Sequence, residues 1–129
     1  MVIKKKDICI ALVDDDPIIL NVFSSILKQV HYRVDFFWSA NEALEVIYAR
    51  HKSYDLIITD ICMPGGDDGV TFAKKVREIN PDLPIMFMTG GVTPEKKNEA
   101  LSLGCIAFLD KPFPLIQKLD EYIYNFLKR

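Results

Sequence analysis

The chain has 129 residues, of which 50% are hydrophobic and 26% are charged, and its formal net charge is −2. This length fits one domain with its own core, and the near-balanced charge excludes a strong field toward nucleic acid or an anionic membrane. The three cysteines lie far apart, which excludes a disulfide framework or a zinc pattern and is typical of a reducing compartment. No stretch approaches the roughly 20 apolar residues of a membrane span. The apolar run behind Lys6 is shorter than the roughly 7–15 residues of a signal peptide. We therefore expect a soluble cytoplasmic protein.

Strand-like apolar runs alternate with helical patterns from the start of the chain. The first run, Ile8–Val13, is rich in β-branched residues and lacks polar alternation, which is typical of a strand buried on both faces. Asp16 is placed to cap the helix that follows, and Pro17 suits its first position. The apolar residues of this helix have helical spacing. They are Ile18, Ile19, Val22, Phe23, Ile26, Leu27 and Val30.

The same alternation continues to the end of the chain. A capping box at Ser39–Glu42 predicts the start of the second helix, and Thr93-Pro94 predicts the start of the fourth. Further strands are expected at about 33–37, 55–59, 85–89 and 105–109, with the third, fourth and fifth helices at about 70–79, 94–103 and 114–127. Five strand–helix units in succession indicate an α/β fold, a doubly wound parallel sheet with helices on both faces. With no linker or repeat in view, we expect a single domain over residues 1–129, with a core of about 7–127.

Polar residues stand where several of these strands end. Asp14 and Asp15 follow the first strand, Asp60 ends the third, Thr89 ends the fourth and Lys111 follows the fifth. The carboxyl ends of parallel strands share one edge of the sheet, so these side chains should meet there. Crowded carboxylates repel each other and need a cation or a chemical task. Oxygen ligands without clustered histidine or cysteine favour Mg²⁺, and an aspartate beside Mg²⁺ and a lysine can accept a phosphoryl group.

Several short motifs stand in order on these elements. They are Val13–Pro17, Tyr54–Asp60, Met63-Pro64, Asp68-Gly69, Met88–Gly90 and Lys111–Phe113. With them, nearly the whole chain resembles the CheY-like receiver domain of two-component response regulators. The resemblance implies a flavodoxin/CheY-like sheet of five parallel strands in the order 2-1-3-4-5. It also implies a regulatory phosphoprotein of two-component signal transduction, not an enzyme, although the domain assists its own phosphorylation and dephosphorylation.

The resemblance assigns a role to each candidate site residue. Asp60 would be the phosphoacceptor, forming an aspartyl phosphate with a phosphoryl group from a sensor histidine kinase or a phosphotransfer protein of a phosphorelay. Asp60 and Asp15 would bind Mg²⁺ directly, Asp14 would help through water, and the backbone carbonyl of Cys62 would be a further ligand.

The resemblance also implies a switch. Thr89 would hydrogen-bond one phosphoryl oxygen and Lys111 would pair with another, with a cis bond between Lys111 and Pro112. Thr89 and Phe108 would couple phosphorylation to the face formed by the fourth helix, fifth strand and fifth helix. That face would contact a downstream protein or an effector domain.

The chain departs from the family pattern at three places. The loop before Asp68 is one residue longer than usual, Phe108 stands where many relatives carry tyrosine, and Pro114 replaces a hydroxyl cap. Phenylalanine lacks the hydroxyl for a hydrogen bond, so the switch would act through packing. The longer loop and Phe108 leave open a phosphorylation-independent interaction module with the same fold, although the complete set of acids argues against it. A flavodoxin-type cofactor carrier is the other alternative, but it would want a glycine- and hydroxyl-rich loop where three aspartates stand.

Overall fold

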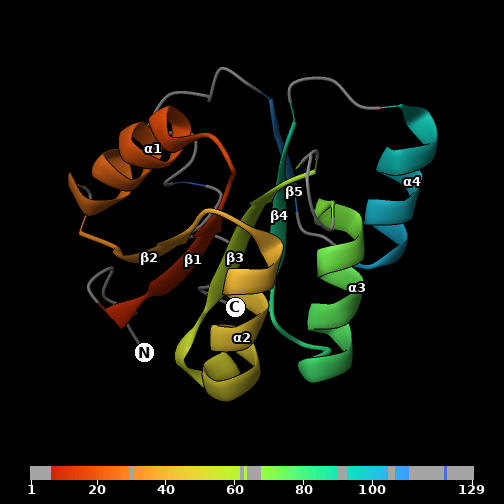
Figure 1. Ribbon diagram of the computed structural model, residues 1–129, viewed down its shortest axis with the longest axis horizontal. Coiled ribbons are helices and arrows are strands. Elements are labelled where there is room, and N and C mark those ends of the chain that lie inside the picture. The colour runs from red at the N-terminus through yellow and green to blue at the C-terminus, as the bar shows by residue number, and fades with distance from the viewer. Residues whose placement is uncertain are drawn as a thin grey trace.

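The computed structural model describes residues 7–29, 31–61, 63, 68–89, 93–104, 107–110 and 121. Strands and helices alternate along the chain (Figure 1). The strands are β1 (Cys9–Val13), β2 (Arg33–Phe37), β3 (Leu56–Asp60), β4 (Ile85–Thr89) and β5 (Ala107–Asp110). The helices are α1 (Pro17–Gln29), α2 (Ala40–Arg50), α3 (Gly69–Ile79) and α4 (Pro94–Ser102), with a short 3-10 helix, η2, at His51–Ser53. The expected last helix, about 114–127, lies outside the described residues except for Glu121, which is helical.

All strand pairs of the sheet are parallel, and the strands lie in the order β2-β1-β3-β4-β5. The prediction of an α/β fold built on a parallel sheet is therefore confirmed. The register places Val13 beside Thr59, and Asp60 beside Met88. The carboxyl ends of β1, β3 and β4 consequently meet at one edge of the sheet.

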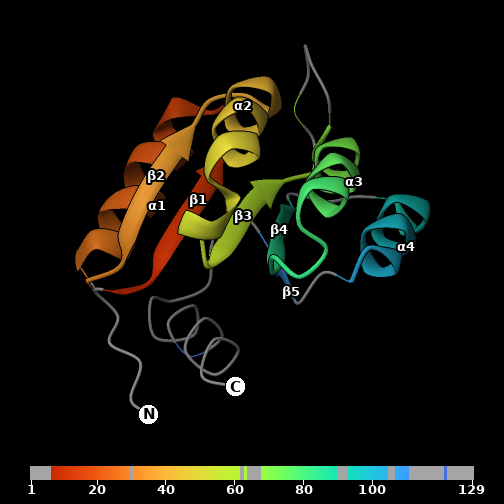
Figure 2. The ribbon, with the colours of Figure 1, turned by 90° about the horizontal axis from the view of Figure 1, so that it is seen from below.

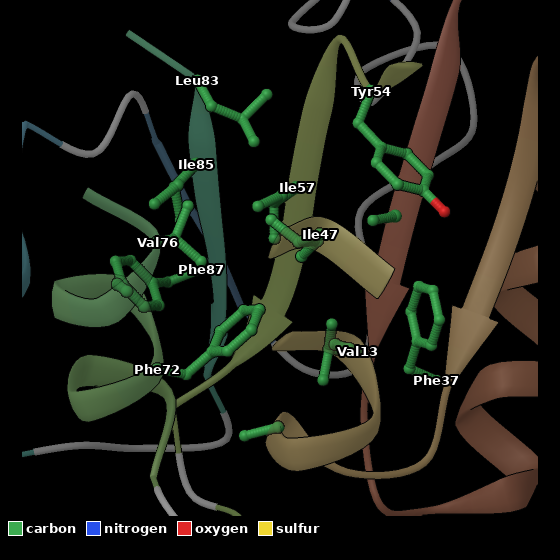
Figure 3. Close-up of a cluster of buried hydrophobic side chains, with 14 of the residues drawn as sticks. Val13, Phe37, Ile47, Tyr54, Ile57, Phe72, Val76, Leu83, Ile85 and Phe87 are labelled. Carbon is green, nitrogen blue, oxygen red and sulfur yellow. The ribbon is translucent and has the colours of Figure 1, made fainter. Parts of the chain in front are cut away.

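Helices cover both faces of the sheet (Figure 2), and each face has its own apolar core. On one face, even-numbered residues of β1 such as Ile10 and Leu12 pack with α1. On the other, odd-numbered residues such as Val13 pack with α2 and α3. Figure 3 shows part of this second cluster, with Phe72 of α3 and Ile47 of α2 beside residues of the strands. Residues of β1 and β3 are buried on both faces, as their unbroken apolar runs predict.

The buried face of α1 differs from the expected one. The helix buries Leu20, Phe23, Ser24 and Leu27, whereas Ile18 is 71% exposed and Val22 is 49% exposed. The expected apolar set combined the buried stripe with residues on the outer side of the helix and omitted Leu20. Spacing alone identified the helix, but a helix with many apolar residues does not reveal which of them face the sheet.

The helix starts are set by side chains that accept backbone hydrogen bonds. Asp16 accepts from the amide of Ile18 at 2.9 Å, with Pro17 as the first helical residue, so the predicted cap of α1 is confirmed. Ser39 accepts from the amide of Glu42 at 3.1 Å and caps α2. Within the described part of the chain, none of the helices is both long and apolar enough to span a membrane.

Candidate functional site

The structure brings together three carboxylates from the ends of two adjacent strands. Asp14 and Asp15 directly follow β1, and Asp60 is the last residue of β3. One carboxylate oxygen from each residue lies within 4.8 Å of the others. Asp14 is fully buried and Asp60 is only 6% exposed, whereas Asp15 is exposed. Two acids of the cluster are therefore buried, and the third is exposed to solvent.

The turn after β1 holds Asp14 in place. The backbone amide of Asp14 donates to the carbonyl of Phe37 at 3.1 Å, which ties this turn to the end of β2. The Asp14 carboxylate accepts from the amide of Asp16 at 2.9 Å. Asp16 itself caps α1 and is not part of the cluster. Of the three successive aspartates, two therefore face the site and the third starts the helix.

The start of α3 lies directly against the backbone of Asp60. A Cβ added at Gly69 would stand 2.0 Å from the carbonyl oxygen of Asp60, so only glycine fits. The Gly69 amide donates to the carbonyl of Ile61 at 2.7 Å, and the Asp68 carboxylate caps α3 by accepting from the amide of Thr71 at 2.8 Å. Sequence reasoning gave Asp68 and Gly69 no such role. The available signal was an aspartate and a glycine at the end of a turn-rich segment, directly before an apolar helix.

Asp68 also contacts the neighbouring helix, a contact that sequence reasoning missed. The ammonium of Lys96 on α4 donates to the Asp68 carboxylate. Partial burial acts to raise the pKa of Asp68, but hydrogen bonds from Lys96 and Thr71 outweigh it, so the pKa lies below its ordinary value. The segment that follows Asp60 is thereby linked to α4 through one carboxylate.

The remaining predicted site residues are described in part or not at all. Thr89 is the last residue of β4 and follows Met88, which lies beside Asp60 in the sheet. Thr89 is paired in register with Asp110 of β5, and its side chain is not among the described parts. Phe108 lies in β5 beside Phe87, and its side chain is likewise not described. Cys62 and Lys111, with the bond to Pro112, lie outside the described residues.

Carboxylate oxygens at this spacing are the donors that a hard divalent cation such as Mg²⁺ prefers. Two of the three acids are buried, and the three carboxylate groups lie close together. A divalent cation would offset their charge. Mg²⁺ keeps several waters when it binds to carboxylates and is often found beside phosphate.

Comparison with known proteins agrees with this geometry. Residues 10–123 match the family described as the response regulator receiver domain. The chain belongs to this family. It is 33% identical over 124 residues to hybrid signal transduction histidine kinase M of Dictyostelium discoideum, covering 90% of this chain and 5% of that protein. It is 33% identical over 103 residues to the transcriptional regulatory protein ZraR of Salmonella typhimurium, covering 80% of this chain and 23% of that protein.

A solved structure shows the same fold. The CheY-like response regulator receiver domain protein of Methanospirillum hungatei is 28% identical, with a TM-score of 0.86 and 94% of each chain covered. The present chain is therefore a receiver domain of the kind found in two-component response regulators, and it spans only a small part of the two curated relatives described above.

Proposed function

We propose that Asp60 accepts a phosphoryl group from the phosphohistidine of a sensor kinase or phosphotransfer protein, in a reaction that needs Mg²⁺. The observation that supports this most directly is the meeting of the Asp14, Asp15 and Asp60 carboxylates within 4.8 Å. Asp15 and Asp60 would hold the ion with the backbone carbonyl of Cys62, and Asp14 would contribute through water. The bound ion would offset the negative charge that gathers on the transferring oxygens.

The chemistry assigned to the chain is nucleophilic attack by a carboxylate. One oxygen of Asp60 attacks phosphorus, the P–N bond to the donor histidine breaks, and the imidazole leaves with the electron pair and takes a proton from solvent. The product is an acyl phosphate on Asp60. In this proposal Lys111 pairs with one phosphoryl oxygen and Thr89 donates a hydrogen bond to another, which stabilises the charge as it develops.

The backbone around Asp60 supports its role as nucleophile. Gly69 is in direct contact with the Asp60 carbonyl, and β3 is flanked by β1 and β4. The carboxylate therefore projects from a rigid strand end. Holding the attacking oxygen in place lowers the entropic cost of the transfer.

The output is proposed to run through α4, β5 and the expected helix at about 114–127. Phosphorylation adds charge and acceptor oxygens that bias a two-state element. Thr89 and Phe108 would respond and change the affinity of that face for a downstream protein or effector domain. We propose that residues 1–129 act as a single receiver domain in the cytoplasm, where the widely spaced cysteines stay reduced.

Phosphorylation by a small donor tests the proposal. The chain is incubated with acetyl phosphate and Mg²⁺, and its intact mass is measured. We expect one added phosphoryl group, which is lost in Asp60→Asn and when the metal is chelated. Asp82→Asn is the matched control because Asp82 is an exposed acid in the turn before β4. An unmodified wild-type chain would favour the phosphorylation-independent interaction module, and modification that survives Asp60→Asn would place the acceptor elsewhere.

Direct metal binding provides a second, independent measurement. Isothermal titration with Mg²⁺ in the absence of any phosphodonor should show one site in the wild-type chain. Removal of one carboxylate from the cluster should weaken binding, so Asp15→Asn should bind Mg²⁺ less tightly, while Asp82→Asn should not differ from wild type. Equal affinities for all three chains would contradict the proposed metal site.

A further inference from the structure

Strand β2 forms one edge of the sheet (Figure 2). The amide of Arg33 donates to the carbonyl of Ile8 at 3.0 Å, and the carbonyl of Phe37 accepts from the amide of Asp14 at 3.1 Å. These residues therefore direct their main-chain groups toward β1. Alternate residues of a strand bond to opposite sides, so Val34 and Phe36 direct theirs outward. Among the described strands, β1 alone pairs with β2.

A groove of about 390 Å³ runs beside this edge. Its lining combines β2 with α2 and Tyr54, and includes Val34, Asp35, Phe36, Phe37, Val46, Arg50 and Tyr54. The Tyr54 hydroxyl donates to the Asp35 carboxylate at 2.7 Å. The surface of β2 beside this edge is therefore hollowed and not fully covered by α2.

The order of the charged side chains along β2 favours a second copy of the same strand as its partner. Arg33 and Asp35 are exposed with opposite charges on either side of Val34, and Phe36 is 41% exposed. If a second copy of β2 lay antiparallel with the two Val34 residues opposite each other, each Arg33 would face the Asp35 of the other copy. Opposite charges in facing positions stabilise a strand pair, whereas like charges oppose it.

We propose that this receiver domain self-associates through antiparallel pairing of the β2 edges around Val34, which joins the two sheets into one. The interface is isologous, because the same residues face each other across the two-fold axis. Backbone bonds between the two facing Val34 residues supply attraction, and the Arg33–Asp35 pairs fix the register. The register centred on Asp35 is excluded because it would place two Asp35 carboxylates opposite each other.

The charged edge has a second physical meaning. Charged side chains on an edge strand commonly protect it from pairing with unrelated strands. In β2 the same charges are complementary to those of a second copy when the two strands pair around Val34. They therefore disfavour pairing with unrelated strands but favour pairing between two copies of β2. Because β2 has only five residues, the contact area is small and the association should be reversible and concentration-dependent.

A charge exchange between two variants tests the register. The unphosphorylated full chain is examined by sedimentation velocity over a wide concentration range. Arg33→Asp gives two facing pairs of acids and Asp35→Arg gives two facing pairs of bases, so each variant alone should dimerise about tenfold or more weakly than wild type. An equimolar mixture of the two variants restores both opposite-charge pairs and should associate at least as tightly as wild type.

Val34→Pro removes the outward amide at the two-fold axis without touching a bond to β1, and proline is tolerated at such edge positions. It should reduce association while circular dichroism and thermal unfolding stay close to those of wild type. Asp60→Asn should dimerise like wild type, because the β2 edge does not depend on phosphorylation. A wild-type chain that stays monomeric would overturn the proposal. So would a dimer that persists in both Arg33→Asp and Val34→Pro, or a variant mixture that fails to associate.

Discussion

Helices α3 and α4 lie side by side (Figures 1 and 2), but different interactions hold each of them against the rest of the domain. Helix α3 buries five residues, and α4 buries Ala100 alone among its described residues. The buried residues of α3 are Gly69, Val70, Phe72, Ala73 and Val76. Burial of large apolar side chains stabilises a helix by several kcal/mol, roughly 1.5–3 for each fully buried side chain. By this measure α3 is anchored in the core and α4 is not.

Polar contacts to α3 hold α4 instead. Lys96 pairs with Asp68, and Glu99 lies 3.5 Å from the ammonium of Lys74. Near the other end, the Nε–H of Arg77 on α3 donates to the carbonyl of Leu103 at 2.8 Å. Ion pairs between partly exposed groups contribute only about 0.2–1 kcal/mol each. Because buried apolar side chains anchor α3, this helix can hold Asp60 in position. Because weaker polar contacts hold α4, a shift of α4 would cost little free energy, which agrees with the proposed output through α4.

The largest expected effect comes from the apolar side of this comparison. Phe72 is fully buried in the cluster that α3 shares with the sheet (Figure 3). Phe72→Ala should lower the free energy of unfolding by about 3–5 kcal/mol, because it removes buried surface and leaves a cavity. Urea denaturation measures the change. Leu101→Ala on α4 is the control: Leu101 is 52% exposed, and its loss should cost within about 0.5 kcal/mol. Similar losses in the two variants would contradict the comparison.

A change at Gly69 should affect both stability and phosphorylation. The added Cβ in Gly69→Ala would stand 2.0 Å from the Asp60 carbonyl oxygen, so backbone must move. We expect a loss of about 1–3 kcal/mol, as for overpacked cores, together with slower phosphorylation by acetyl phosphate. Gly104→Ala separates the two effects. Gly104 has a φ of 75°, and an added Cβ there has no neighbour within 4 Å.

The Gly104 variant should lose about 1–2 kcal/mol through backbone strain and keep its rate of phosphorylation. Urea denaturation and intact mass over time measure both properties in both variants. If Gly69→Ala is phosphorylated at the wild-type rate, α3 does not position Asp60.

A change at Arg77 should have an effect of similar size, because this one side chain joins three segments. Its Nε–H donates to the carbonyl of Leu103, and a terminal nitrogen donates to the carbonyl of Leu83. Arg77→Met removes both bonds and should cost about 1.5–3 kcal/mol, the value for hydrogen bonds to a charged group. Arg77→Lys keeps the charge but lacks the planar fork, so it should lose most of the same stability. Thermal and urea unfolding measure the losses. A lysine variant as stable as wild type would show that charge alone matters.

Sequence patterns predicted the meeting of the acidic side chains better than they predicted these contacts, for a physical reason. Asp14 and Asp60 could be placed together because both follow apolar strands, and parallel strands end at one edge of the sheet. That inference needs only the local pattern and the topology. The burial of Leu20 and the exposure of Ile18 were missed because apolar residues surround much of α1, so spacing did not define one face.

The α3–α4 contacts could not be predicted in the same way. Lys96 lies 28 residues from Asp68, and Arg77 lies 26 residues from Leu103. A surface lysine or arginine has many acceptors within reach of its long side chain, and the choice depends on how two helices pack. The close approach of Gly69 to Asp60 is likewise a property of packing, although the glycine itself was visible in the sequence.

The smallest expected effect concerns the Lys96–Asp68 pair and its dependence on pH. The pKa of Asp68 is lowered in the folded chain because Lys96 and Thr71 outweigh the effect of burial. A lowered pKa means that the stabilisation is present above the ordinary value of about 3.9 and is lost as pH falls through the folded value. Lys96→Met should therefore cost up to about 1 kcal/mol near pH 7, because one ion pair is lost. That cost should shrink toward zero well below pH 4, where Asp68 is protonated in both chains.

Urea denaturation from neutral to acidic pH measures this difference, and the ¹³C shift of the Asp68 carboxyl reports its pKa directly. The pKa should rise in Lys96→Met, since a favourable charge is removed from the carboxylate. Lys52→Met is the matched control. Lys52 is exposed in η2, which is far from α4 in the sequence, and its loss removes the same positive charge. A stability difference that is the same at all pH values, or an Asp68 pKa equal in the three chains, would show that packing of the lysine stem holds α4. The polar contacts would then not be what distinguishes α4 from α3.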